Sequence, residues 1–503
     1  MKKLHCTLLV LLAPVIVFGQ ATLTRSVTHT QPMTGLVFWP DNAEDHHTDL
    51  GQSISLEFQY CLPCKVVTGK QNGQILYNWT WLDNILNDIA GRGHQAVIRF
   101  RYEYPSGEKI NGTKGATAVP DYIKALPDYN ETYAKNPGGD GPTYYADWSN
   151  NELLWFTKQF YTDLQARYGN DPRIAFLEVG FGHWSEYHIY GTKIQFGVNF
   201  PTKQYQSEFF QHLDTTMTIP WLVSIDAGDS QYSPMQSDAA MRACTFGLFD
   251  DSFMHSEHDF SQGDGWNEQC WQWSDPTGTR WHTGVNGGEI SYYTDNDQQN
   301  FLNPAGMYGV TWEQAAAKYH ITFINANDCT EGRYATPQRV TQAGLATGYH
   351  FVVTSVTTSP STSDSTSPLP EEGLGEVTVT NTGVAPIYRD AYLAVCTPID
   401  TTRATESLRG LLPGQSHTYT IPTALTDADN LHIVSNYILP GQEIQFDANC
   451  TITTTTDICS PLPIDKPGEV SKVILLPSGQ LRIISPHATC TILGQPITYQ
   501  QKP

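Results

Sequence analysis

The chain has 503 residues and carries 51 acidic side chains against 29 basic ones, which gives a formal net charge of −22. This length predicts two or three domains. The acidic excess argues against a nucleic-acid partner, because phosphates need lysine and arginine for neutralisation. It also disfavours a strongly anionic polymer as a ligand.

The first 20 residues have the pattern of a secretory signal peptide. Lys2 and Lys3 form a charged start, residues 8–17 form an apolar stretch, and Gly19 lies near the expected cleavage point. The apolar stretch is too short to favour a membrane span, and no other stretch approaches the roughly 18 apolar residues that a span needs. We therefore expect a secreted, periplasmic or cell-surface protein with no membrane-spanning segment.

Nine of the ten cysteines follow this segment. Because nine is odd, at least one thiol should be free or paired between chains. Cys61 and Cys64 have CxxC spacing, for which we expect a local disulfide or an inert pair. A redox role would need a thioredoxin-like context, which the surrounding sequence does not indicate.

Residues 21–347 alternate short apolar runs with helical patterns, and all 12 tryptophans of the chain lie at or before Trp312. Helices are predicted around residues 82–89, 153–164 and 338–346. Such alternation is typical of a parallel sheet with crossover helices, so the α/β class is expected. Eight strands are predicted, at residues 35–39, 54–58, 96–102, 174–180, 221–226, 246–253, 282–286 and 321–325. They predict a (β/α)8 TIM barrel, with a doubly wound sheet as the competitor.

The remaining chain is rich in threonine, serine, proline and valine, and an all-β sandwich is expected over residues 348–435. Segments 376–380, 392–395 and 417–421 alternate apolar and polar residues at period two. Residues 359–370 are predicted to form a linker or a long loop. A small β-rich tail is expected over residues 436–503.

Two glutamates follow barrel strands at the end where TIM barrels carry their active sites. Glu186 lies in GHWSEYH after strand 4, and Glu289 lies in NGGE after strand 7, where Gly287 and Gly288 suggest a tight turn. Glycoside hydrolysis needs two carboxyl groups that flank the bond. In a large clan of retaining barrel hydrolases the acid/base ends strand 4 and the nucleophile ends strand 7, and this similarity implies that Glu186 is the acid/base and Glu289 the nucleophile. An inverting mechanism stays open, because the sequence gives no distance between the two carboxyl groups. The alternatives are a loop carboxylate paired with histidine and a carboxylate at a helix start.

Other strand ends supply candidate substrate-binding residues. An arginine inside the barrel would orient a catalytic carboxylate or form a structural salt bridge, and tryptophan rings suit the flat faces of sugars. The candidates are Trp39, Arg99, His183, Trp184, Asp226, Asp251, Asp259 and Asn325. We expect no cofactor and no metal, because the spacing of His183, His188, His255, His258 and Asp259 fits no metallohydrolase motif.

Five stretches occur in a fixed order between about residues 30 and 435: RFRYEYP, GHWSEYH, DDSFMHSEHDF, NGGE and VTVTNTGVAPIYRDAYLAV. Together they resemble a bacterial family of exported proteins that is catalogued as a domain of unknown function. The resemblance implies a glycoside-hydrolase-like TIM barrel with an Ig-like β-sandwich, and a hydrolase role by analogy. Ser185 and Tyr187 stand where relatives are expected to have glycine and tryptophan.

The C-terminal stretch LPGQEIQFDANCTI resembles a short β-repeat of secreted or cell-surface proteins in some Gram-negative bacteria. It implies association with the cell surface.

The expected function is hydrolysis of a poly- or oligosaccharide. A non-catalytic glycan-binding or surface protein on a degenerate barrel is the alternative, favoured by the missing Asn-Glu pair after strand 4. A metal-dependent hydrolase or esterase is a third hypothesis.

Overall fold

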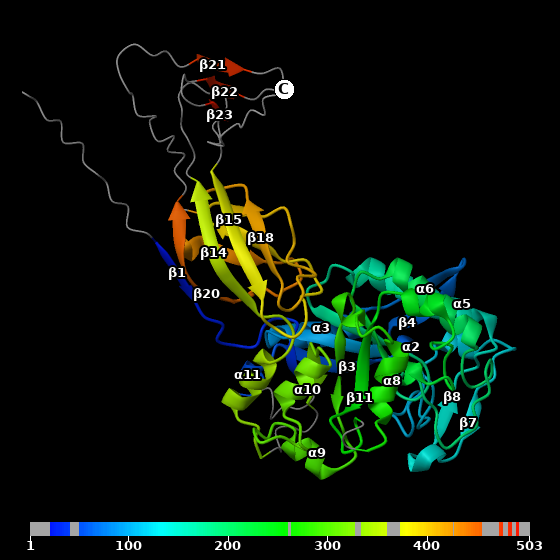
Figure 1. The fold of residues 1–503 in the computed structure, drawn as a ribbon. Helices are drawn as coiled ribbons and strands as arrows, with labels where there is room; N and C mark the ends of the chain where they lie inside the picture. Colours follow the sequence, from blue (N-terminus) through cyan, green and yellow to red (C-terminus); the bar gives the residue numbers. More distant parts are fainter. Residues whose placement is uncertain are drawn as a thin grey trace, which may run out of the picture.

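The computed structural model describes residues 21–40, 50–259, 263–326, 333–359, 373–425, 427–454, 472–475, 481–484 and 489–491. The predicted signal peptide at residues 1–20 lies outside the described residues. So does almost all of the linker predicted at residues 359–370. Figure 1 shows a helix-covered barrel with a separate group of β-strands beside it.

Eight parallel strands form a closed barrel, which confirms the predicted fold class. Around the barrel they are β2 (Gly35–Phe38), β3 (Leu56–Cys61), β6 (Gln95–Phe100), β9 (Ile174–Val179), β10 (Trp221–Ser224), β11 (Gly247–Phe253), β12 (Asn286–Ile290) and β13 (Phe323–Asn325). Most of their residues are buried, because parallel barrel strands pack against the interior on one face and helices on the other.

The seventh strand differs from its prediction. The strand starts at Asn286, where the predicted strand ended, and a 3-10 helix η4 (Arg280–His282) precedes it. The expected tight turn at Gly287 and Gly288 was wrong, because both glycines lie within β12. A Cβ on Gly287 would lie 2.5 Å from the Phe323 ring, and one on Gly288 would lie 2.0 Å from the Asp250 carbonyl oxygen. Glycine is needed here for close packing inside the barrel wall.

The predicted helices at residues 82–89, 153–164 and 338–346 are confirmed as α3 (Thr80–Gly91), α5 (Asn151–Tyr168) and α11 (Pro337–Leu345). The other α-helices are α2 (Pro63–Val66), α4 (Asp121–Lys124), α6 (Lys203–Thr216), α7 (Ala239–Ala243), α8 (Trp266–Ser274), α9 (Asp295–Asn300) and α10 (Trp312–Lys318). Helix α5 shows why such helices form. The Asn150 side chain caps the first turn, and Leu153, Phe156 and Phe160 bury one face. Within the described residues, no helix is both long and apolar enough to cross a bilayer.

Short elements decorate the barrel. They are the hairpins β4 (Val67–Gln71) with β5 (Gln74–Tyr77) and β7 (Thr132–Ala134) with β8 (Thr143–Tyr145), and the 3-10 helices η1 (Gly51–Ser53), η2 (Pro137–Gly139) and η3 (Ile225–Gly228). Both hairpins lie in the long connections that follow barrel strands β3 and β6.

The all-β part consists of two main sheets that pack together. One has the order β1 (Thr22–Arg25), β20 (Phe446–Thr454), β14 (Phe351–Ser359), β15 (Leu374–Asn381) and β18 (Ser416–Ile421). The other has the order β17 (Thr401–Arg403), β16 (Tyr392–Cys396) and β19 (Leu431–Val434). Val377 of the first sheet and Leu393 of the second lie in one buried apolar cluster, as in a β-sandwich.

The first sheet takes β1 from before the barrel and β20 from beyond residue 435. The domain boundaries predicted at residues 347 and 435 stay predictions. Within the expected C-terminal tail, a small antiparallel sheet is formed by β21 (Lys472–Leu475), β22 (Leu481–Ile484) and β23 (Thr489–Thr491).

The sandwich contacts the barrel at the end where strands begin. The Tyr388 hydroxyl donates to the Trp281 carbonyl at 2.6 Å, and Arg389 donates to the carbonyls of Gly169 and Thr218. Those three barrel residues precede β12, β9 and β10. The opposite end of the barrel, where strands terminate, is therefore not covered by these contacts.

Candidate active site

A cavity of about 740 Å³ opens where the barrel strands end. Six of the predicted site residues line it: Trp39, Trp184, Glu186, Asp226, Asp251 and Glu289. They come from the ends of β2, β9, β10, β11 and β12, so closure of the barrel brings distant sequence segments together. Their chemical roles stay predictions.

Glu186 is presented by a strained loop after β9. Trp184, Ser185 and Tyr187 have φ values of 53°, 64° and 64°. The left-handed region costs a residue with a side chain about 1–2 kcal/mol. Three such residues around one glutamate store strain at the place where function is expected.

The loop is held by hydrogen bonds that compensate this strain. The Ser185 hydroxyl donates to the Phe100 carbonyl at 3.0 Å, and the Trp184 amide donates to the Glu103 carbonyl at 3.1 Å. Gly180 is required, because a Cβ there would lie 1.9 Å from the Ser185 carbonyl oxygen. The loop therefore fixes the position of Glu186 relative to the barrel.

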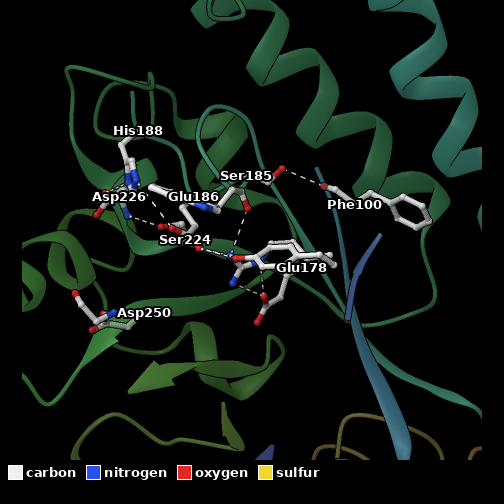
Figure 2. A network of polar contacts seen from close by, with 12 residues as sticks. Phe100, Glu178, Ser185, Glu186, His188, Ser224, Asp226 and Asp250 are labelled. Atoms are coloured by element: carbon white, nitrogen blue, oxygen red, sulfur yellow. Dashed lines mark hydrogen bonds and ion pairs between the residues drawn. The ribbon is translucent and has the colours of Figure 1, made fainter. Parts of the chain in front are cut away.

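Arg99 connects Glu186 to the barrel interior. It is only 1% exposed, and its Nε donates to Glu178 at 2.7 Å while its Nη1 donates to Glu186. The Tyr60 hydroxyl also lies 3.4 Å from Glu186 Oε1. Figure 2 shows Glu178 and Glu186 meeting at this network. Arg99 thus forms a buried salt bridge with Glu178 and also contacts the site carboxylate Glu186, so it matches both of the roles considered for it from the sequence.

Glu186 and Asp251 interact directly through a side-chain hydrogen bond. Burial, followed by the charge of Asp251, raises the pKa of Glu186 well above its usual range, and Arg99 opposes this. Burial and the charge of Asp226 raise the pKa of Asp251 to about 7. The pair therefore retains a proton more readily than isolated carboxyl groups would.

Glu289 projects from β12 and is 6% exposed. Glu289 lines the cavity, and among the described residues its carboxyl group is influenced by burial and by neighbouring charges rather than held by a hydrogen bond or ion pair. Burial raises its pKa to about 8, while the guanidinium of Arg99 opposes the rise. The charge of Glu289 also raises the pKa of Glu186, which places both carboxyl groups in one electrostatic environment.

His188 links Asp226 to this cluster. Its Nδ1 lies 2.8 Å from Asp226 Oδ2, and its Nε2 lies 4.0 Å from Glu186 Oε2. Among the described residues, Glu186, His188 and Asp251 form the group whose ligand atoms could hold a metal ion, since they lie within 4.8 Å of one another. Of the histidines considered as ligands from sequence, only His188 belongs to this group.

The histidines after β11 belong to a different network. The buried Asp250 accepts hydrogen bonds from His258 at 2.8 Å, Asn267 at 2.6 Å and Trp271 at 3.2 Å, and His255 pairs with Asn267 at 2.8 Å. These contacts attach α8 to β11. The His-rich motif is thereby accounted for by packing between a strand and a helix.

Besides Arg99, three predicted binding residues lie outside the cavity lining. His183 is fully buried and pairs with the Tyr145 hydroxyl at 2.8 Å. Asp259 lines a separate cavity of about 270 Å³ and lies 3.2 Å from Lys318. Asn325 is 2% exposed and pairs in register with Glu289 in the barrel wall.

Aromatic side chains that sequence reasoning did not single out form much of the cavity wall. They are Tyr60, Tyr104, Tyr190, Tyr232, Tyr292 and Tyr293. Tyr293 and Tyr292 are 72% and 50% exposed, and Trp266 of the same cavity is 40% exposed. The Tyr-Tyr pair directly after the NGGEIS segment was the available signal, because it follows a strand end.

Cys61 and Cys64 are both free cysteines, so the CxxC segment forms no disulfide. Burial raises the pKa of the Cys64 thiol to about 11 and that of Cys61 further. A raised pKa lowers the thiolate fraction that reacts, which agrees with the inert pair that was one of the two expectations.

Comparison with known proteins gives structural similarity alone. No family model matches the chain, and no curated protein matches it. The resemblance to an exported family therefore stays a prediction. Among solved structures, the chain is similar to the catalytic domain of a β-amylase from Paenibacillus polymyxa, at 9% identity and a TM-score of 0.38, covering 62% of this chain and 98% of that one.

Two further similar structures are also barrels of named glycoside hydrolases. A GH42 β-galactosidase from G. stearothermophilus has 13% identity and a TM-score of 0.34, with 64% of this chain and 57% of that chain covered. A GH5 family lichenase from Caldicellulosiruptor sp. F32 has 10% identity and a TM-score of 0.32, with 61% and 82% covered. Matches this distant transfer no residue role.

Proposed function

We propose that the chain is a glycoside hydrolase that cleaves a poly- or oligosaccharide in the cavity at the ends of the barrel strands. One observation carries this proposal. Two buried carboxyl groups, Glu186 after β9 and Glu289 on β12, line the same aromatic cavity and influence each other electrostatically. Glycosidases use two such carboxyl groups.

The surroundings favour different roles for the two groups. Burial and the charge of Asp251 raise the pKa of Glu186 well above its usual range, and Glu186 shares a hydrogen bond with Asp251, so it is suited to protonate the leaving oxygen. Glu289 has no hydrogen-bond partner among the described residues and is available to attack the anomeric carbon. Arg99 would hold Glu186 in place, and Glu186 would then activate the water that releases the sugar.

The aromatic wall supports a carbohydrate substrate. Tyr and Trp rings offer flat apolar surfaces with a polar edge, and they lose little side-chain entropy on contact with a ligand. Trp184, Tyr190 and Trp266 line the cavity together with the carboxyl groups. Such a site combines apolar faces for sugar rings with polar groups that fix their orientation.

A non-catalytic glycan-binding protein is the second candidate. The direct ion pair between Arg99 and Glu186 favours it, because a nearby cation opposes protonation of the proposed acid. Saturable glycan binding without any product would establish this alternative.

The test is sugar release from a panel of neutral and acidic polysaccharides. We expect the wild type to release sugar from at least one of them. Glu186→Gln should reduce the rate about 10²–10⁴-fold through loss of acid–base catalysis, and Glu289→Gln should reduce it to background. Both substitutions keep side-chain volume, so circular dichroism should show intact folding.

Asp259→Asn is the matched control, because Asp259 is a buried acidic residue that lines another cavity. Its rate should stay within about twofold of the wild type. Full activity of Glu289→Gln would remove Glu289 as the nucleophile. Equal losses in all three variants would indicate a general structural effect.

We also propose, from the pattern of residues 1–20, that the protein is exported. The assignments to an exported family and to the cell surface belong to the same proposal. Mass spectrometry of the mature protein should show an N-terminus near residue 20. An intact N-terminus on protein collected outside the cytoplasm would contradict cleavage.

A further inference from the structure

We propose that Glu186, His188 and Asp251 form a binding site for a divalent transition-metal ion, and that the bound ion inhibits hydrolysis. The metal site stands on geometry alone, whereas the inhibition rests on the proposed function. The three ligand atoms lie within 4.8 Å of one another. All three residues line the cavity, so an ion can enter from solvent.

Two polar atoms of this site point to a missing ligand. His188 Nε2 and Asp251 Oδ2 are buried, and apart from the bond between the Glu186 and Asp251 carboxyl groups neither has a hydrogen-bond partner within the described structure. The 4.0 Å between His188 Nε2 and Glu186 Oε2 is too long for a hydrogen bond. Buried polar atoms without partners are costly, and coordination to one ion would satisfy both at once.

The environment of His188 matches that of a metal ligand. Asp226 Oδ2 lies 2.8 Å from His188 Nδ1, so Nδ1–H can donate to the carboxylate and leave the Nε2 lone pair free. Histidine ligands almost always donate their second ring nitrogen to such a partner, which fixes the ring and raises its basicity. Figure 2 shows His188 and Asp226 together beside Glu186.

The donor set indicates the class of ion. One imidazole and two carboxylates suit zinc and related transition metals better than calcium, which prefers oxygen ligands only. Three protein ligands leave a further position for water. The ligands are also held rigidly, since Glu186 and His188 flank Tyr187 in the strained loop and Asp251 belongs to strand β11.

The chemical consequence follows from the use of Glu186. A carboxylate that coordinates a metal ion cannot at the same time hold the proton that the leaving oxygen needs. A bound ion also occupies space between Glu186 and Asp251, close to where the glycosidic oxygen would lie. Zinc should therefore act as a reversible inhibitor at this site.

The binding test uses zinc alone, with the chelator-treated full chain and no sugar. Isothermal titration calorimetry at pH 7.5 should show one zinc ion per wild-type chain. His188→Ala and Asp251→Asn should abolish this binding. Asp226→Asn should weaken it about 10–100-fold, because Asp226 only orients the ligand.

Asp229→Asn is the matched control, since Asp229 lines the same cavity but lies outside the ligand group. It should bind zinc as the wild type does, and circular dichroism should show that every variant is folded. No zinc binding by the wild type, or equal binding by the His188→Ala and Asp229→Asn variants, would overturn the site.

The inhibition is tested separately on the substrate that the wild type hydrolyses. Sugar release should fall as zinc occupies the site and should recover fully with EDTA. Zinc binding without inhibition, or hydrolysis that requires zinc, would overturn the inhibitory role. If no glycan is hydrolysed, the proposed function fails, while the calorimetric result still decides the metal site.

Discussion

Glu289 shows how burial sets the chemistry of a single residue. Its carboxyl group is removed from solvent inside the barrel end, and the guanidinium of Arg99 only partly offsets the resulting preference for the neutral form. A nucleophile must be ionised to attack, so this preference has a direct effect on activity.

We expect kcat/KM of the free enzyme to rise with pH up to about pH 8. Burial raises the pKa of Glu289 to about 8, so the ionised fraction falls about tenfold for each pH unit below that value. Burial and the charge of Asp251 also raise the pKa of Glu186, which favours its protonated form. A pH–rate profile checks this, and an optimum near pH 5 would contradict it.

At the scale of single elements, the loop between β9 and His188 is closely packed. The Ser185 carbonyl group approaches Gly180 so closely that a methyl group there would displace the chain. The geometry of Glu186 therefore depends on a glycine that never contacts the cavity.

Gly180→Ala should reduce sugar release by at least about 10²-fold, because displacements of about 1 Å in a site can cost that much. Far-UV circular dichroism should show that the barrel is retained. Gly91→Ala is the control, since nothing lies within 4 Å of a Cβ at that helix end. Equal activity of the two variants would show that the strained loop does not position Glu186.

The sequence predicted those elements that a pattern of neighbouring residues identifies. Apolar runs indicated the barrel strands, because these strands are buried on both faces, and the strand-end rule pointed to Glu186 and Glu289. Strand β12 was displaced in the prediction because Gly287 and Gly288 have low strand propensity, although packing against Phe323 and Asp250 requires them.

The partners of the site residues could not be predicted in this way. The contacts of Arg99 with Glu178 and Glu186, and the pairing of His188 with Asp226, form only when the barrel closes. The tyrosines of the cavity wall come from strand β3 and from several loops, so apart from the Tyr-Tyr pair after NGGEIS their convergence had no sequence signal. His183 and Asp259 showed the same strand-end pattern but lie elsewhere.

In the whole molecule, the barrel and the sandwich share a continuous apolar core. Phe58 and Phe176 of the barrel interior belong to the same buried cluster as Val377 and Leu393 of the two sheets. The sandwich thus closes the end of the barrel opposite the site. We expect the two parts to unfold together rather than independently.

Leu393→Ala tests this coupling, because Leu393 is fully buried in the sandwich. The cavity should cost about 2–5 kcal/mol. All tryptophans lie at or before Trp312, so tryptophan fluorescence reports on the barrel. Its melting temperature should fall together with that of the β-sheet signal. An unchanged fluorescence transition would show that the barrel is independent of the sandwich.

The central claim assigns acid catalysis to Glu186 and nucleophilic attack to Glu289. The most direct measurement compares the two glutamine variants on an aryl glycoside of the substrate sugar, whose nitrophenol leaves without protonation. The account predicts that Glu186→Gln cleaves the aryl glycoside at a substantial rate while failing on the natural glycan, and that Glu289→Gln cleaves neither. Retained cleavage by Glu289→Gln, or equal loss of both activities in Glu186→Gln, would contradict it.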